Sequence, residues 1–159
     1  MLLRREIEQM TSVIMTAAVA LAAIAPAAAQ PVATTEPQTS KPIGPYSPFV
    51  EAGELIFLSG QIALDPSTGK LDPGSSIETQ TAIVWANIER VLSSAGLTLK
   101  DVVQANVYLT DMNEFGRMNV AYAKALGEIR PARTTIGVQA LPLGARIEIA
   151  VIARRTDSH

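Results

Sequence analysis

Apolar side chains recur every three or four positions between Ser75 and Gly96, the spacing that gathers them on one side of an α-helix. The stripe comprises Ile77, Thr81, Val84, Ile88, Val91, Leu92 and Ala95. The run Ser75-Ser76-Ile77-Glu78 is a capping box that predicts where the helix begins, and Gly96 predicts where it ends. Trp85 lies off the centre of the stripe, so we expect a partly buried edge residue or one that borders a subunit contact.

Strands are predicted on both sides of this helix, from β-rich runs before it and from period-two alternation after it. Before it, residues 48–50 and 55–59 flank a turn at 51–54 and predict a β-hairpin. After it, residues 102–110 predict a strand with a core face and a second face. The expected core face comprises Val103, Ala105, Val107 and Leu109, and the other face Gln104, Asn106, Tyr108 and Thr110.

A second helix is predicted to begin near Asn113 as its N-cap and to end at Gly127. Its apolar positions are Phe115, Met118, Tyr122, Ala125 and Leu126. Pro131 prevents the chain from continuing as a helix after Gly127. Residues 134–138 and 145–153 predict two more strands. The order β-β-α-β-α-β-β predicts an α+β fold, a mixed sheet with two helices on one face.

The last predicted strand is apolar on both of its faces. After Arg146 and Glu148 it continues as Ile149-Ala150-Val151-Ile152. A strand that is apolar on both faces is covered on both, and two helices can cover only one face of the sheet. We therefore expect the second face to meet another subunit in a homo-oligomer.

The N-terminal residues have a composition of their own. An Ala-rich apolar run from Thr11 closes on Ala27-Ala28-Ala29, the small-residue pattern of a signal-peptide cleavage site. We expect a signal peptide at 1–29, a flexible leader at 30–40, the folded domain at 41–155 and a polar tail at 156–159. Cleavage would leave a periplasmic or secreted protein without stable membrane insertion. Two alternatives stay open, a membrane anchor formed by the same run and initiation at Met10.

The composition of the chain argues against several kinds of partner and active site. The chain has 159 residues, a formal charge of −2 and no run of Lys or Arg, which argues against nucleic acid as a partner. It has no cysteine, and its one histidine is His159 in the polar tail, which argues against thiolate and histidine-based metal or catalytic sites. We therefore expect a small-molecule ligand and no metal.

Two charged residues in the C-terminal β-rich region stand out as candidates for chemistry. Arg133 can bind a planar carboxylate through two parallel hydrogen bonds, and Glu148, set among isoleucines, can have a raised pKa suited to proton transfer. Structural roles are the alternative: Glu148 would pair with Arg146, and Arg133 would cap backbone carbonyls. The two residues together suggest a site for a small acid, although each of them taken alone favours its structural role.

Eight short motifs follow one another along residues 41–155. The motifs are Ile43-Gly44-Pro45-Tyr46-Ser47, Ser59-Gly60-Gln61-Ile62, Asp65-Pro66 with Thr68-Gly69, Gly96-Leu97, Asp101-Val102-Val103, Leu109-Thr110-Asp111-Met112-Asn113, Pro131-Ala132-Arg133 and Ile147-Glu148-Ile149. Each motif is weak alone, but the ordered set resembles the RidA (YjgF) family of reactive-intermediate deaminases. The resemblance implies a chorismate-mutase-like fold, a homotrimer with clefts at subunit interfaces, and cofactor-free hydrolysis of 2-imino or enamine acids to 2-keto acids and ammonia.

The resemblance also implies roles for individual residues. Arg133 matches the arginine that grips the substrate carboxylate, and Glu148 matches the acid near the reacting carbon. The positions that match the lining of the cleft are Tyr46, Ser59, Gly60, Asn119 and Thr135, the last where some relatives have cysteine. Without the resemblance, Tyr46 would be a hairpin-edge aromatic, Asn119 a solvated helix residue and Ser59-Gly60 a strand-ending bulge.

These roles imply a hydrolase similar to the 2-iminobutanoate/2-iminopropanoate deaminases. A protein that binds small carboxylates with the same arginine but without turnover is the alternative. An endoribonuclease fits less well, because the chain is acidic and lacks a basic track.

Overall fold

The computed structural model describes residues 44–156. The expected signal peptide, the leader, the start of the domain and the end of the tail lie outside the described residues. The elements in chain order are β1 (Phe49–Ala52), β2 (Leu55–Leu58), α2 (Ile77–Ser94), η1 (Leu99–Asp101), β3 (Val102–Leu109), η2 (Met112–Glu114), α3 (Phe115–Leu126), β4 (Ala132–Gly137), η3 (Pro142–Gly144) and β5 (Ile147–Arg154). None of the helices in residues 44–156 has the length and apolarity needed to cross a bilayer.

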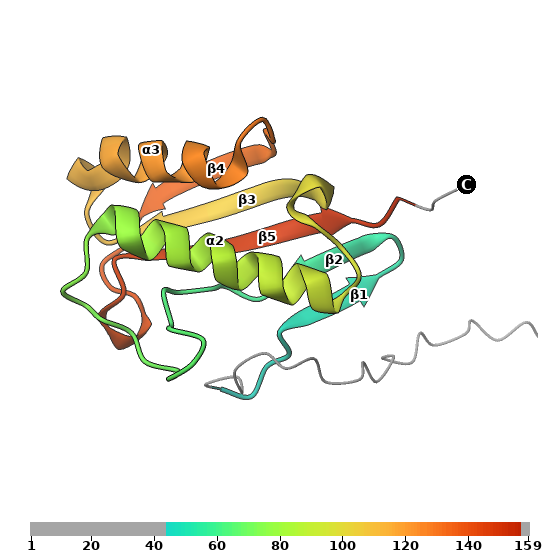
Figure 1. Ribbon diagram of the computed structural model, residues 1–159, viewed down its shortest axis with the longest axis horizontal. Helices are drawn as coiled ribbons and strands as arrows, with labels where there is room; N and C mark the ends of the chain where they lie inside the picture. Colours follow the sequence, from blue (N-terminus) through green and yellow to red (C-terminus); the bar gives the residue numbers. More distant parts are fainter. Residues whose placement is uncertain (1–43, 157–159) are drawn as a thin grey trace, which may run out of the picture. The chain divides into compact units, whose positions relative to one another are not determined.

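The strands form one mixed sheet in the order β1-β2-β5-β3-β4 (Figure 1). Neighbouring strands are antiparallel, except that β3 and β4 run parallel. The last strand of the chain, β5, therefore lies in the middle of the sheet between β2 and β3. Both α2 and α3 lie on the same face of the sheet (Figure 1), so the predicted α+β fold and its element order are confirmed.

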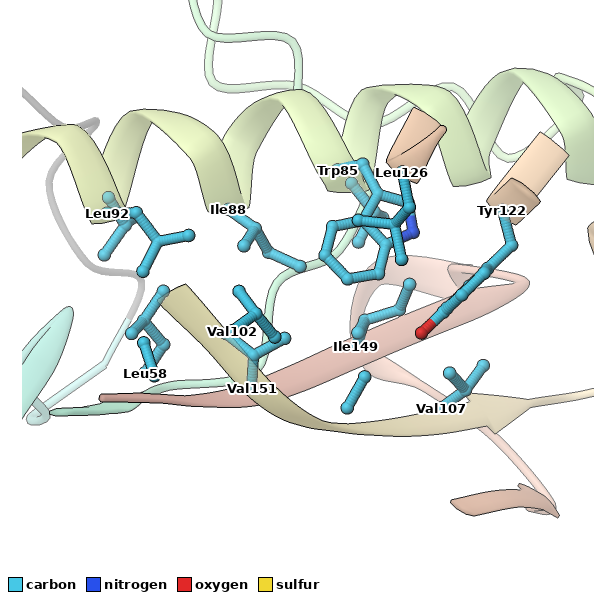
Figure 2. Close-up of a cluster of buried hydrophobic side chains, with 14 of the residues drawn as sticks. Leu58, Trp85, Ile88, Leu92, Val102, Val107, Tyr122, Leu126, Ile149 and Val151 are labelled. Carbon is cyan, nitrogen blue, oxygen red and sulfur yellow. The ribbon is translucent and has the colours of Figure 1, made fainter. Parts of the chain in front are cut away.

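The hydrophobic core lies between the helices and the sheet face beneath them. Every residue of the predicted α2 stripe is buried. Figure 2 shows Ile88 and Leu92 of α2 pointing down toward Val102 and Val151 of the sheet. Full burial of one such side chain contributes roughly 1.5–3 kcal/mol relative to exposure, so this stripe is what holds α2 to the sheet.

Both predicted N-caps are wrong. The side chain of Ser76, rather than Ser75, accepts the capping hydrogen bond, from the backbone N–H of Thr79. Ser75 belongs to the preceding turn, where its hydroxyl donates to a backbone carbonyl. Ahead of α3, the cap of η2 is Asp111, whose Oδ1 accepts from the N–H of Asn113 at 2.9 Å. Ser75 thus lies in the turn before α2 and Asn113 lies within η2, so neither residue is the N-cap of the helix that follows.

Two predicted burial states are also wrong. Val103 is exposed and Val102 is buried, because a β-bulge between Val102 and Gln104 shifts the register of β3 against β5. Trp85 is only 2% exposed rather than a partly buried edge residue, and its ring meets that of Tyr122 edge to face. The reason is that α3 packs beside α2 and covers the side of the helix on which Trp85 lies (Figure 2).

The second face of the sheet carries apolar side chains that no element of residues 44–156 covers. Exposed members are Val50, Leu55, Phe57 and Ile136. Ala150 and Ile152 of β5 are half-buried on this face. The sequence expectation of a strand apolar on both faces is confirmed, and the homo-oligomer that it led to stays a prediction.

Candidate active site

The register of the sheet places Arg133 and Glu148 on opposite faces. Arg133 lies opposite Ala105, whose side chain is in the core beneath the helices. Glu148 lies opposite Tyr108, three residues further along β3. Since side chains alternate between faces, residues 105 and 108 point in opposite directions, and their partners do the same. One chain therefore holds two half-sites, named here by their charged residue, and does not bring the two charges together.

The Arg133 half-site is formed by β4 and the neighbouring helix α3. Nη1 of Arg133 donates to Oδ1 of Asn119 at 2.7 Å. Its Cζ lies 4.6 Å from the centre of the Tyr122 ring and 5.7 Å from that of Phe115. The side chain is exposed, and Asn119 is its one hydrogen-bond partner among residues 44–156. Most of the N–H donors of this fork therefore have no acceptor among residues 44–156 and are available to a carboxylate.

Carbonyl capping, the structural alternative for Arg133, is carried out by its neighbour Arg130. Nη1 of Arg130 donates to the carbonyl of Ile129 at 2.9 Å and to that of Gly127, at the end of α3. Arg133 instead engages a side-chain amide and two aromatic rings. Arg130 thus binds the backbone at the end of α3, whereas most donors of Arg133 remain available to a ligand.

Thr135 belongs to the same half-site, because it lies two positions along β4 from Arg133 and opposite Val107 of the core face. Its Oγ1 is buried and has no hydrogen-bond partner in residues 44–156. Asn119 and Tyr122 are three positions apart on α3, the spacing that puts both on one side of a helix. The predicted residues Arg133, Asn119 and Thr135 are therefore brought together.

The Glu148 half-site is formed where β5 meets the segment after β2. The backbones of Gln61 and Ile149 exchange two hydrogen bonds, at 2.9 and 3.0 Å, and this bridge lays Gly60 against Glu148. A Cβ on Gly60 would lie 2.0 Å from Oε1 of Glu148. Glycine is therefore required here if the carboxylate is to keep its place.

Burial raises the pKa of Glu148 above its ordinary value, because the charged carboxylate is less well solvated there. It has no ion-pair partner in residues 44–156, and the alternative pairing with Arg146 does not occur. Arg146 binds Glu114 instead, with Nε to Oε2 at 2.9 Å. A half-buried carboxylate with a raised pKa and no cation beside it is suited to exchange protons with water.

Tyr46 precedes β1, and Ser59 lies between the end of β2 and Gly60. Oγ of Ser59 donates to the carbonyl of Ser47 at 2.6 Å, which ties the segment carrying Tyr46 to the end of β2. The Tyr46 ring is 51% exposed. Of the predicted residues, Gly60 is thus in contact with Glu148, while Tyr46 is linked to Ser59 through its neighbour Ser47. Within residues 44–156, no group of His, Cys, Asp and Glu side chains is placed to hold a metal ion.

The rings of Tyr122 and Phe115 are the functional candidates that sequence reasoning missed. Both were assigned to the apolar stripe of the second helix, and Tyr122 is indeed buried. The signal that could have found Tyr122 is its spacing of three from Asn119, a predicted site residue on the same helix.

Comparisons with known proteins identify relatives that share most of this domain. The family model described as Endoribonuclease L-PSP matches residues 36–155. A RutC family protein of Pyrococcus horikoshii is 48% identical over 71% of this chain and 89% of its own length. The 2-iminobutanoate/2-iminopropanoate deaminase of Mus musculus is 42% identical over 70% of this chain and 82% of its own length. The crystal structure of RidA from an Antarctic Psychrobacter is similar with a TM-score of 0.70 and 36% identity, covering 76% of this chain and 97% of that one.

Proposed function

The chain belongs to the RidA (YjgF) family, whose model carries the description Endoribonuclease L-PSP, and we propose that it hydrolyses 2-imino or enamine acids to 2-keto acids and ammonia. The observation that carries the proposal is the Arg133 guanidinium, held by Asn119 and two rings with most of its donors unengaged. This arrangement fits the carboxylate that 2-imino and 2-keto acids share. The activity printed for the mouse relative supports the same reaction class.

We propose further that the working site lies between copies of the chain, in a homotrimer. The Arg133 and Glu148 half-sites lie on opposite faces of one sheet, so a second copy must supply the carboxylate that faces Arg133. The exposed apolar residues Val50, Phe57 and Ile136 provide a face for such packing. Association would also bury the half-buried Ile152 of β5.

The proposed reaction needs positioning and proton transfer. An iminium carbon is already electrophilic, so the protein has to hold the carboxylate, place a water molecule and move protons. Arg133 holds the carboxylate while Glu148 accepts a proton from the attacking water, which forms the bond from oxygen to C2. Glu148 returns this proton to nitrogen, which becomes the –NH3+ leaving group. As the C–N bond breaks and ammonia leaves, Glu148 removes the proton of the new hydroxyl so that C2 becomes a carbonyl, and this second proton leaves with the ammonia as ammonium. The balance is one iminium acid and one water in, and one 2-keto acid and one ammonium out.

The test generates a 2-imino acid in situ with an amino-acid oxidase and follows its decay. We expect wild type to accelerate the decay and Arg133→Ala to lower kcat/KM by about 10–100-fold, because a charge-assisted hydrogen bond is worth roughly 1.5–3 kcal/mol. Arg130→Ala is the matched control and should keep its activity, since Arg130 caps α3. No acceleration by wild type, or equal acceleration by Arg133→Ala, would contradict the proposal.

A binding protein without turnover is the second candidate. The crystal structure of E. coli TdcF with bound serine is similar to this chain at 30% identity, with a TM-score of 0.71, covering 77% of this chain and 98% of that one. Serine carries the carboxylate that Arg133 is suited to bind. Saturable binding of serine or pyruvate without imine hydrolysis would favour this candidate. Salt-sensitive RNA binding or cleavage would favour the endoribonuclease instead.

We also propose that the protein is exported after removal of residues 1–29. The Ala-rich run that closes on Ala27-Ala28-Ala29 supports this assignment. The intact mass of protein recovered from the periplasm or the medium tests it. A chain that begins at Gln30 is expected, and a full-length chain retained with the membrane or the cytoplasm would overturn the export proposal.

A further inference from the structure

A buried aromatic ring lies beneath the guanidinium of Arg133. Cζ of Arg133 is 4.6 Å from the centre of the Tyr122 ring, within the distance at which the face of an aromatic ring attracts a cation. Phe115 adds a second ring at 5.7 Å. The Asn119 hydrogen bond, at 2.7 Å, engages only one nitrogen of the fork. One hydrogen bond leaves the guanidinium able to rotate about it, and contact with a ring face restricts that rotation.

The ring itself is held in place by the core. Tyr122 is 8% exposed, and its ring meets Trp85 edge to face, with centroids 5.2 Å apart and planes at 84°. Trp85 is 2% exposed on α2. Figure 2 shows Tyr122 reaching from α3 toward the sheet beside Trp85. An exposed charged group thus rests on a ring that the packing of α2 against α3 makes immobile.

The hydroxyl of Tyr122 does not explain the presence of this residue. It is buried without a hydrogen-bond partner in residues 44–156, and burial raises the pKa of the phenol, so it stays neutral. An unpaired buried hydroxyl is unfavourable for folding. The ring is therefore the part of Tyr122 that acts on Arg133.

We propose that Tyr122 is a positioning residue that orients the Arg133 guanidinium for carboxylate binding. This inference rests on the proposed function, because it concerns how the carboxylate of the substrate is held. Without the ring, Arg133 must be ordered each time a carboxylate binds, and this loss applies equally to bound substrate and transition state. Such a loss raises KM and leaves kcat nearly unchanged.

The test compares Tyr122→Phe, which keeps the ring, with Tyr122→Met, which fills similar space without one. In the oxidase-coupled assay we expect Tyr122→Met to raise KM about five- to tenfold with kcat within about twofold, and Tyr122→Phe to match wild type. Val120→Ala is the matched control, since Val120 is 70% exposed on the same helix. The emission of Trp85, the one tryptophan of the chain, reports whether each variant keeps its core packed.

A second measurement separates positioning from a purely structural role. If Tyr122 acts through the guanidinium, Tyr122→Met has no further effect on KM in an Arg133→Ala background. Should Tyr122→Met fail to fold, Phe115→Leu tests the same contact from the second ring, with an expected rise in KM of about twofold.

The outcomes distinguish this inference from the proposed function. Wild type that hydrolyses imines while Tyr122→Met leaves KM unchanged, or lowers kcat instead, overturns the positioning role alone. An additive effect of Tyr122→Met in the Arg133→Ala background overturns it too, as does an unchanged KM in Phe115→Leu when Tyr122→Met cannot be folded. Wild type without any imine hydrolysis overturns the proposed function and this inference together.

Discussion

Two carboxylates of this domain are withdrawn from water, and their surroundings differ completely. Glu114 is 6% exposed and lies between two arginines. Arg146 donates to it from Nε at 2.9 Å and Nη2 at 2.5 Å, and Nη1 of Arg117 lies 3.5 Å away. Glu148 is half-buried on the opposite face, with the backbone of Gly60 against it and no cation beside it in residues 44–156.

The partner of a buried charge, more than its burial, indicates what the charge does. The Glu114 carboxylate is saturated by donors, and the backbone N–H of Arg146 is bound in turn by Oε1 of Gln80 at 2.9 Å. This network ties η2, α2 and the start of β5 together. The Glu148 carboxylate has no such donors, so water or a substrate can exchange protons with it.

Removing the paired carboxylate should have the largest effect, and it should fall on stability. Glu114→Ala leaves Arg146 without its partner, and we expect the free energy of unfolding to drop by about 2–4 kcal/mol. The value lies below that of a fully buried pair because the Arg146 side chain is 36% exposed. Urea denaturation measures this drop in the free energy of unfolding. Imine hydrolysis by the folded fraction should persist, and a large loss of kcat without loss of stability would contradict a structural role for Glu114.

Displacing the unpaired carboxylate should have the next largest effect, and it should fall on catalysis. In Gly60→Ala the new Cβ would lie 2.0 Å from Oε1 of Glu148, so the carboxylate must move. We expect kcat to fall at least about tenfold, since a misplaced general base loses much of its contribution. Stability should change little, because the end of a flexible side chain can give way. Gly116→Ala, with no atom near the added Cβ, is the matched control; equal kcat in both variants would count against a role for Glu148.

The smallest effect should be a pH-dependent gain in stability in Glu148→Gln. Folding raises the pKa of Glu148 above 4.5, so the folded state binds its proton more tightly than the unfolded state. Below pH 4.5 both states are protonated and the carboxyl carries no penalty. As the pH rises through the raised pKa, the folded protein must bury part of a charge and loses stability.

Glutamine does not titrate, so the stability of Glu148→Gln should match that of wild type at low pH and modestly exceed it at neutral pH. Thermal unfolding across this pH range measures the difference. A variant less stable than wild type at neutral pH would mean that Glu148 is paired after all.

Much of the fold could be predicted because it follows from local periodicity. The α2 stripe and the β-rich runs that form β2 and β5 depend on the residues of a single element, so they could be predicted before any contact was known. The candidates Arg133 and Glu148 could be named because each is a charge in a β-rich apolar setting. The caps at Ser76 and Asp111 were missed because several neighbouring polar residues could each have served.

The elements, their order and the chemical groups available for a small acid follow from the amino-acid sequence. The separation of those groups into two half-sites follows from contacts between distant segments. The pairing of β3 with β4 and β5 separates Arg133 from Glu148 and sends Arg146 to Glu114. The packing of α3 beside α2 buries Trp85 and sets Tyr122 beneath Arg133. The physical reason is that periodicity states which residues of one strand share a face, whereas strand partners and register arise from contacts between segments far apart in the chain.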